Sequence, residues 1–145
     1  LKIKVIFWST PFVNHKLQLE RPLRLIQITL AVLWIYQGLV PKILFQSSAE
    51  IGIWQAIGLE LHLAKIAVAL SGLIEIGFGC TFLIWQKAVF IHQLNIWGLS
   101  GLLLLITFTD PLQLTTAFNP VIMNITMIVI SMIAIQLLKL RTQQA

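Results

Sequence analysis

The sequence predicts an all-α fold: an integral membrane bundle of four helices, with a short amphipathic helix in the first outer loop. Two observations predict it. Of the 145 residues, 58% are apolar and only 10% are charged, whereas soluble domains carry about 25% charged residues. The charged residues also stand far apart, leaving uncharged runs at 25–41, 88–109 and 111–138 and a run at 66–86 that only Glu75 interrupts. About 20 apolar residues span the hydrocarbon core of a bilayer, so each run is long enough or nearly so.

These runs place the four spans at about 23–40, 63–85, 88–108 and 120–138 in one membrane domain, 23–138. Residues 1–22 form a basic cytoplasmic lead-in, and residues 139–145 form a cytoplasmic tail. We expect Pro22 in the first turn of the first helix, where its missing N–H costs nothing. Gly38 and Pro41 favour an end or a bend of that helix.

The segment between the first two spans contains a helix signal of its own. Ser47 and Glu50 have the spacing of a capping box. Ile51, Trp54 and Ile57 then fall on one face, and Gly58 favours a stop. We therefore expect a short amphipathic helix that lies on the membrane surface.

Two spans carry a recognisable inner face. Small residues recur at helical spacing along the second span, which lets another helix approach closely. These residues, with Glu75 among them, are Ala64, Ala67, Ser71 and Gly79. On the fourth span one face holds Asn124, Met127, Ser131 and Ala134, and we expect that face to point inward.

The distribution of Lys and Arg predicts the orientation. Eight of these residues lie in the lead-in, the turn after the second span and the tail, against only Lys42 and Lys65 on the other side. We therefore expect both termini in the cytoplasm. The net charge of +5 does not indicate nucleic-acid binding, because the basic residues sit at the ends of apolar runs and form no basic face. The partner that the sequence does predict is the lipid bilayer.

Glu75 is the most informative polar residue, because it falls near the middle of a span. A carboxylate there costs at least about 2.5–3.5 kcal/mol, and the simplest escape is to stay protonated. Lys42 sits at the outer end of the first span and could point either way, whereas Tyr36, Asn95, Ser100 and Asn124 are neutral candidate partners. Two interpretations stay open: an acid that carries a proton or binds a ligand, and a neutral side chain that joins two helices.

The other candidate functional residues lie near the outer ends of the first and fourth spans. Tyr36, Gln37 and Lys42 could form a polar outer mouth, although for Tyr36 and Lys42 we favour anchoring of the helix end at the interface. Asn119 is expected to cap the fourth helix, and Asn124 to bridge helices.

No residue is predicted to be catalytic, and no metal site is predicted. His15, His62 and His92 share no metal-ligand spacing, and His92 is expected at the interface. The single cysteine, Cys80, is expected to fill space as a small apolar residue. Nothing in the residues alone identifies a cofactor.

Three segments together resemble the DoxX-like family of small bacterial membrane proteins. They are Trp34–Lys42, with its sequence Tyr-Gln-Gly-Leu-Val-Pro-Lys at the end, Gly72–Gly77, and Asn119-Pro120 with Asn124. The resemblance covers about residues 21–138. Family members often have a Lys just before the Asn of the last motif, where this chain has Met123, so a charge pair from that position is absent here.

The resemblance implies a four-helix bundle in the bacterial inner membrane and a link to membrane redox systems that use quinone. It therefore favours a non-catalytic subunit or accessory of a quinone-linked redox system, with a redox protein or further copies of the chain as partners. Two alternatives stay open: a small proton-coupled transporter or channel that acts as an oligomer, and a structural scaffold of a membrane complex. An enzyme is the least expected, because the chain has neither a cysteine pair nor paired histidines.

Overall fold

The computed structural model describes residues 15–109, 111 and 120–143, and in this part of the chain every regular element is a helix. The all-α prediction is therefore confirmed. The elements, in chain order, are α1 (His15–Gln37), the π-helix η1 (Gly38–Leu44), α2 (Ser48–Ala56), α3 (Leu61–Ile84), α4 (Val89–Thr109) and α5 (Pro120–Gln143).

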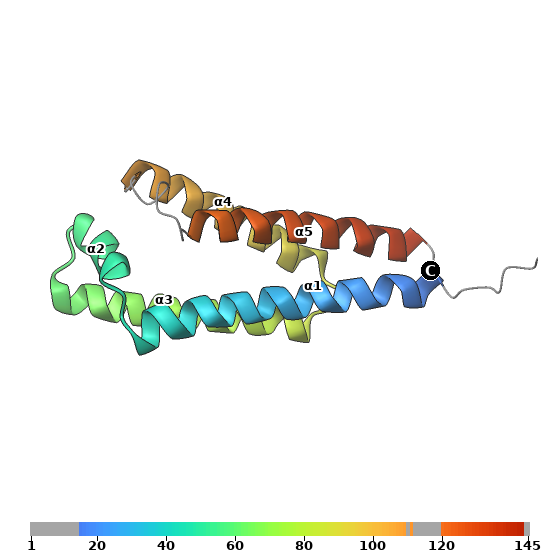
Figure 1. Ribbon diagram of the computed structural model, residues 1–145, viewed down its shortest axis with the longest axis horizontal. Helices are drawn as coiled ribbons and strands as arrows, with labels where there is room; N and C mark the ends of the chain where they lie inside the picture. Colours follow the sequence, from blue (N-terminus) through green and yellow to red (C-terminus); the bar gives the residue numbers. More distant parts are fainter. Residues whose placement is uncertain (1–14, 110, 112–119, 144–145) are drawn as a thin grey trace, which may run out of the picture.

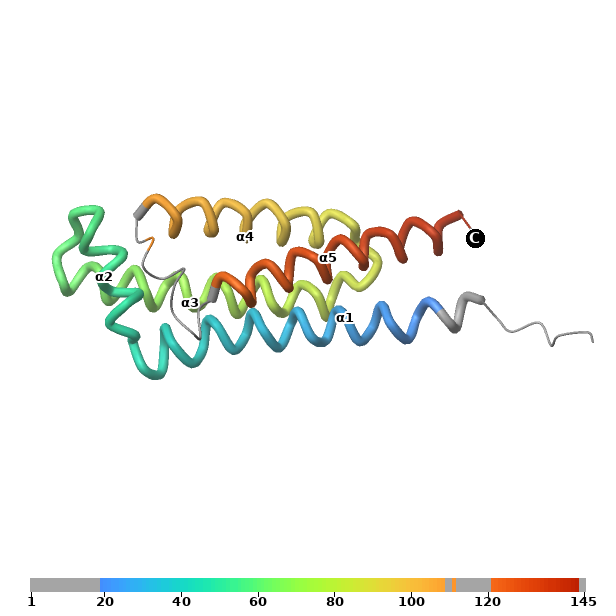
Figure 2. Tube along the Cα trace, turned by 45° about the horizontal axis from the view of Figure 1, so that its top comes forward, coloured from blue at the N-terminus to red at the C-terminus, as the bar shows by residue number. Residues whose placement is uncertain are grey.

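The four long helices pack as two pairs. Helix α1 lies along α3, α4 lies along α5, and the pairs meet mainly where α1 contacts α5. Figure 1 shows the α4–α5 pair above the α1–α3 pair, and α2 folded over one end. We call that end the outer end. Figure 2 shows that α1 begins and α5 ends at the opposite, inner end. There Arg141 donates a hydrogen bond to Glu20.

Among the described residues, four helices are long and apolar enough to cross a membrane: Leu19–Leu44, Leu61–Ile84, Val89–Phe108 and Val121–Gln143. Large apolar side chains such as Leu25, Ile74, Trp97 and Phe108 stay exposed on their outer faces. Exposure of this kind is expected where lipid, rather than water, surrounds a protein. The protein is therefore a multi-pass membrane protein.

Helix α1 begins earlier than the sequence suggests. It starts at His15, so Pro22 lies inside the helix and not in its first turn. A proline there removes one backbone hydrogen bond and costs about 3 kcal/mol. The ring is exposed, and the adjacent Leu23 is buried with Ala134 and Leu138 of α5. This packing holds the helix together across the proline.

Helix α1 ends at Gln37, as Gly38 and Pro41 led us to expect, and the first span continues as the π-helix η1. Pro41 has no N–H to continue an α-helical ladder. The bonds that follow reach further back along the chain, from Phe45 N to Val40 O (3.1 Å) and from Ser47 N to Pro41 O (2.8 Å). Gln46 then turns the chain with a positive φ of 43°. Irregular helical turns of this type occur frequently at functional sites.

Two glycines bring η1 and α3 into backbone contact. A Cβ atom added at Gly72 would lie 2.7 Å from Gly38 O and 3.0 Å from Lys42 Cβ. Only glycine permits this approach. The buried face of α3 contains Ala64, Val68, Gly72, Gly79 and Phe82. The face predicted from small residues included Ala64 and Gly79 correctly but did not include Val68 and Gly72.

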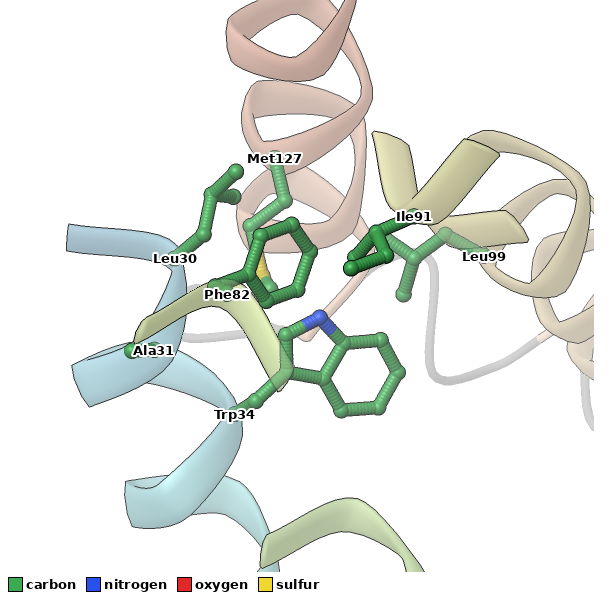
Figure 3. Packing of buried hydrophobic residues seen from close by; sticks show 7 residues of the cluster. All are labelled: Leu30, Ala31, Trp34, Phe82, Ile91, Leu99 and Met127. Atoms are coloured by element: carbon green, nitrogen blue, oxygen red, sulfur yellow. The ribbon is translucent and has the colours of Figure 1, made fainter. Parts of the chain in front are cut away.

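The core between the helix pairs combines apolar packing with a buried polar network. Phe82 of α3 and Trp34 of α1 lie beside Met127 of α5, as Figure 3 shows, with Ile91 and Leu99 from α4 opposite. Asn95 of α4 accepts a hydrogen bond from Trp34 Nε1 (2.7 Å), and its own Nδ2 donates to Ser131 Oγ (2.7 Å). The network therefore joins α1, α4 and α5.

The predicted inner face of α5 is confirmed, because Asn124, Met127, Ser131 and Ala134 are all buried. His92 was expected at the membrane interface, and that prediction is wrong. Its ring is buried, with Nδ1 3.4 Å from Ser131 Oγ and an edge-on contact with Phe82. The inward face of α4 carries it into the core.

Helix α2 forms where the sequence predicts it, but it is held differently. Ser47 is the N-cap residue and makes no side-chain capping bond. The carboxylate of Glu50 lies 3.6 Å from Lys42 Nζ. Ile51 packs with Ala64 and Val68 of α3, whereas Ile57 is exposed. The apolar face of α2 therefore packs mainly against α3, and the helix covers the outer end of the bundle. Gly58 ends this segment with a φ of +98°, as expected.

Candidate functional site

A cavity of about 370 Å³ lies between the helices at the outer end, and we call it the outer pocket. All five helices contribute to its wall, together with η1. Its polar lining residues are Tyr36, Gln37, Lys42, Ser47, Glu50, Glu75 and Asn124. Its less polar wall is formed by Pro41, Ala49, Ile53, Leu102, Ile106 and Met123. The volume lies within the usual range of small-molecule sites, about 300–1,000 Å³.

Lys42 forms the charged centre of this pocket. Its Nζ lies 2.6 Å from Glu75 Oε1 on α3 and 3.6 Å from Glu50 Oε2 on α2. Both partners of the closer pair are mostly buried, with 11% of the Lys42 side chain and 15% of the Glu75 side chain exposed. One ammonium group therefore faces two carboxyl groups, and one of them belongs to the helix that covers the pocket.

The sequence left open whether Lys42 points toward Glu75, and the structure shows that it does. The family pattern suggested a partner from the position of Met123, but the ammonium group comes from Lys42 instead. The close Gly38–Gly72 contact sets η1 against α3, so Cβ of Lys42 lies beside Gly72, one helical turn from Glu75. The sequence places Lys42 at the end of its span, and it contains no signal for the contact between η1 and α3.

A pair of amide side chains forms another part of the pocket wall. Gln37 Nε2 of α1 donates to Asn124 Oδ1 of α5 (3.3 Å) and lies 3.9 Å from Met123 Sδ. Asn124 therefore bridges two helices, as expected, and the amide of Gln37 finds its partners. Met123 takes part in the site through its sulfur atom.

Two buried polar atoms of the pocket residues have no hydrogen-bond partner among the described residues: Glu75 Oε2 and Asn124 Nδ2. One is an acceptor and the other is a donor. Buried polar atoms are almost always paired, so each exception calls for an explanation. Because both residues line the same cavity, a molecule with its own donor and acceptor could satisfy both atoms at once.

Of the six candidate residues that the sequence singles out, five line this one cavity: Tyr36, Gln37, Lys42, Glu75 and Asn124. Asn119 lies outside the described residues. Tyr36 is 56% exposed although it borders the pocket. Asn95, a candidate partner of Glu75, bonds to Trp34 and Ser131 instead. A role in function stays a prediction for all of them.

Three pocket residues of α2, Ala49, Glu50 and Ile53, were not among the candidates, because nothing in the sequence shows that α2 folds back over the bundle. The spacing of Glu50 from Ser47 suggested that Glu50 caps the helix, so its ion pair with Lys42 was not predicted. The sequence signal that could have pointed to Glu50 is the scarcity of charge: the chain has only five carboxylate side chains, and one held inside the bundle needs a partner.

Fold and site together define a multi-pass four-helix membrane protein with a polar pocket at one end. Comparison with known families matches residues 31–132 to the DoxX-like family. The chain belongs to that family. No match was found among curated proteins or among solved structures.

Proposed function

We propose that this protein is a non-catalytic subunit of a quinone-linked membrane redox system and that its outer pocket binds a small hydroxylated molecule of the quinol class. The observation that carries the proposal is the pair of unpaired buried atoms, Glu75 Oε2 and Asn124 Nδ2. A hydroxyl group donates one hydrogen bond and accepts others, so it suits this combination.

The same chemistry separates the two redox forms of a quinone. A quinol hydroxyl can donate to Glu75 and accept from Asn124. A quinone carbonyl can only accept, and it would leave the Glu75 oxygen without a donor. We therefore expect the pocket to prefer the reduced form. The apolar wall, which includes Leu102, Ile106 and Ile53, suits the ring of such a molecule.

A pure scaffold role has less support. Helix packing by itself gives no reason for a cavity of about 370 Å³ that contains an unpaired carboxylate oxygen. Each such atom costs about 1–3 kcal/mol when it lacks a partner, so a protein that only packs would gain from filling the space with apolar side chains.

A proton-coupled transporter is the second candidate, and one observation favours it. Polar side chains continue inward from the pocket, from Asn124 to the Trp34–Asn95–Ser131 network and His92. Met127, Leu30 and Leu99 are fully buried along the same core, and they oppose a continuous wet path. A pH-sensitive dye enclosed in proteoliposomes tests this candidate: proton flux that Glu75→Gln abolishes would support the transporter over the binding subunit.

We place the inner end of the bundle in the cytoplasm of a bacterial cell. The inner end carries most of the basic residues: Arg21, Arg24, Lys87, Lys139 and Arg141. At the outer end, Lys42 is paired with Glu75 inside the bundle. Positive charge marks the cytoplasmic side. The outer pocket would then lie on the periplasmic side of the inner membrane.

The binding proposal is tested by thermal unfolding of the purified protein with a short-chain quinol, the matching quinone and the quinol dimethyl ether. A ligand that binds only the folded state stabilises it by about 2.7 kcal/mol at 100 times its dissociation constant. We expect a clear rise of the melting temperature with the quinol and much smaller rises with the quinone and the ether, because neither of these two has a hydrogen-bond donor.

The matched variants are Asn124→Leu, which removes the amide donor at similar volume, and Thr126→Val, an exposed position on the same helix. Asn124→Leu should lose most of the quinol effect relative to its own unliganded melt, and Thr126→Val should keep it. Equal effects of all three ligands, or an undiminished effect in Asn124→Leu, would contradict the proposal.

A further inference from the structure

The inner end of the bundle contains a second cavity, of about 290 Å³, which we call the inner pocket. Three separate parts of the chain line it: α1, the turn between α3 and α4, and α5. Its charged lining residues are Glu20, Arg24, Lys87 and Arg141. Three cationic side chains and one carboxylate give this pocket a net positive charge of two, in a protein with few charges.

Hydrogen bonds hold the inner pocket in shape. Gln27 is buried and donates its side-chain amide to the backbone oxygen of Gln86, which ties α1 to the α3–α4 turn. Arg141 Nη2 donates to Glu20 Oε1 (2.9 Å), which ties α5 to α1. The walls of the pocket are therefore positioned before any ligand arrives.

Arg24 and Lys87 have no ion-pair partner among the residues that the structure describes. Both are exposed, and both line the inner pocket. Helix α4 begins at Val89, just after Lys87, and its amino-terminal end adds a partial positive charge. Two unneutralised cationic groups on a shared cavity are suited to an anion with several acceptor oxygens, such as a phosphate group.

The surroundings of the pocket distinguish a lipid from a free anion. Each basic residue has a large, exposed apolar neighbour in the sequence: Leu25 beside Arg24, Trp85 near Lys87 and Leu140 beside Arg141. Exposed leucine and tryptophan side chains give nothing to a free phosphate ion, whereas they provide a surface for acyl chains. Basic pockets between membrane helices are known to hold the head groups of anionic lipids.

We propose that the inner pocket binds the head-group phosphate of one anionic phospholipid through Arg24 and Lys87, with Arg141 as a third donor. The bound lipid would join α1, the α3–α4 turn and α5 from the membrane side. This site does not depend on the outer pocket or on what the outer pocket binds.

The test is lipid binding by the delipidated, detergent-solubilised protein, measured by native mass spectrometry and by thermal unfolding. Three additions are compared at equal concentration: phosphatidylglycerol, phosphatidylcholine and inorganic phosphate. We expect phosphatidylglycerol to bind and to stabilise, phosphatidylcholine to do so weakly, and inorganic phosphate to have almost no effect.

The double variant Arg24→Gln/Lys87→Gln should bind phosphatidylglycerol about thirtyfold more weakly, because each Lys or Arg near an anionic lipid surface contributes roughly a fivefold gain. Both positions are exposed, so the variant should fold. Lys65→Gln, an exposed basic position at the other end of α3, is the matched control and should bind normally. Lys87→Arg should also bind normally, since it keeps the charge.

Three results would overturn the proposal. The first is equal stabilisation by phosphatidylglycerol and phosphatidylcholine. The second is unchanged binding of phosphatidylglycerol in the double variant. The third is stabilisation by inorganic phosphate alone as strong as by the lipid, which would make the pocket a free-anion site.

Discussion

Breaking the Lys42–Glu75 pair from the lysine side should destabilise the protein strongly. At 2.6 Å, the attraction of two unit charges is roughly 6 kcal/mol at an effective dielectric constant of 20. Withdrawing each ion from water costs several kcal/mol, so the intact pair is close to balance. Lys42→Met removes the attraction and leaves Glu75 buried next to Glu50, and we expect a loss of about 3–5 kcal/mol.

The substitution from the other side should cost less. In Glu75→Gln, Lys42 keeps Glu50 at 3.6 Å, and the new amide can still hydrogen-bond, so we expect a loss of about 1–3 kcal/mol. The double variant Lys42→Met/Glu75→Leu removes both charges together. It should be clearly more stable than the sum of the two single losses predicts, because no unpaired charge is left.

The assay is reversible unfolding in detergent, or a thermal melt in which the Lys42→Met loss should lower the midpoint by about 6–20 °C. Lys65→Met, an exposed position on α3, serves as the control and should change stability by no more than about 0.5 kcal/mol. A Lys42→Met variant that melts with the wild type, or a double variant that shows the plain sum, would refute this account of the ion pair.

Three further predictions concern packing, the buried network and orientation. Gly72→Ala places a Cβ atom 2.7 Å from Gly38 O and should cost about 1–3 kcal/mol, whereas Gly77→Ala on the same helix meets nothing within 4 Å and should be neutral or stabilising by up to about 1 kcal/mol; equal melting temperatures would count against the close contact. Trp34→Phe leaves Asn95 Oδ1 without its donor and should cost about 1–3 kcal/mol, while Trp85→Phe at an exposed site should have little effect on the melt. In a Cys80→Ser background, Gln46→Cys should react with an impermeant thiol reagent in intact spheroplasts and Gln143→Cys should not; reaction of both or of neither would exclude the proposed orientation.

The fold was predictable because its main determinants are one-dimensional. A span requires a run of apolar residues, and run length can be counted along the chain. The observed α3 and α4 begin and end within two residues of the expected 63–85 and 88–108. The start of α1 was not predictable in this way, because Pro22 suggested a boundary, and only packing of Leu23 against α5 shows that the helix continues across it.

The candidate site was predictable in its membership but not in its pairing. Polar residues within apolar runs stand out, so Glu75, Gln37 and Asn124 could be found from the sequence alone. Their partners depend on which helix faces meet. The Gly38–Gly72 contact, which brings Lys42 to Glu75, and the folding of α2 over the pocket, which brings Glu50, both arise from tertiary packing. Helical periodicity contains no information on these contacts between elements.

The most direct test of the central claim is an experimental structure of the protein with a short-chain quinol bound. The account predicts the ligand in the outer pocket, with ligand oxygen atoms about 2.5–3.2 Å from Glu75 Oε2 and from Asn124 Nδ2. The Lys42–Glu75 pair should remain intact beside it. A pocket that holds only water under saturating quinol, or a ligand bound elsewhere while both atoms pair within the protein, would contradict the claim that the outer pocket is a binding site for this class of molecule.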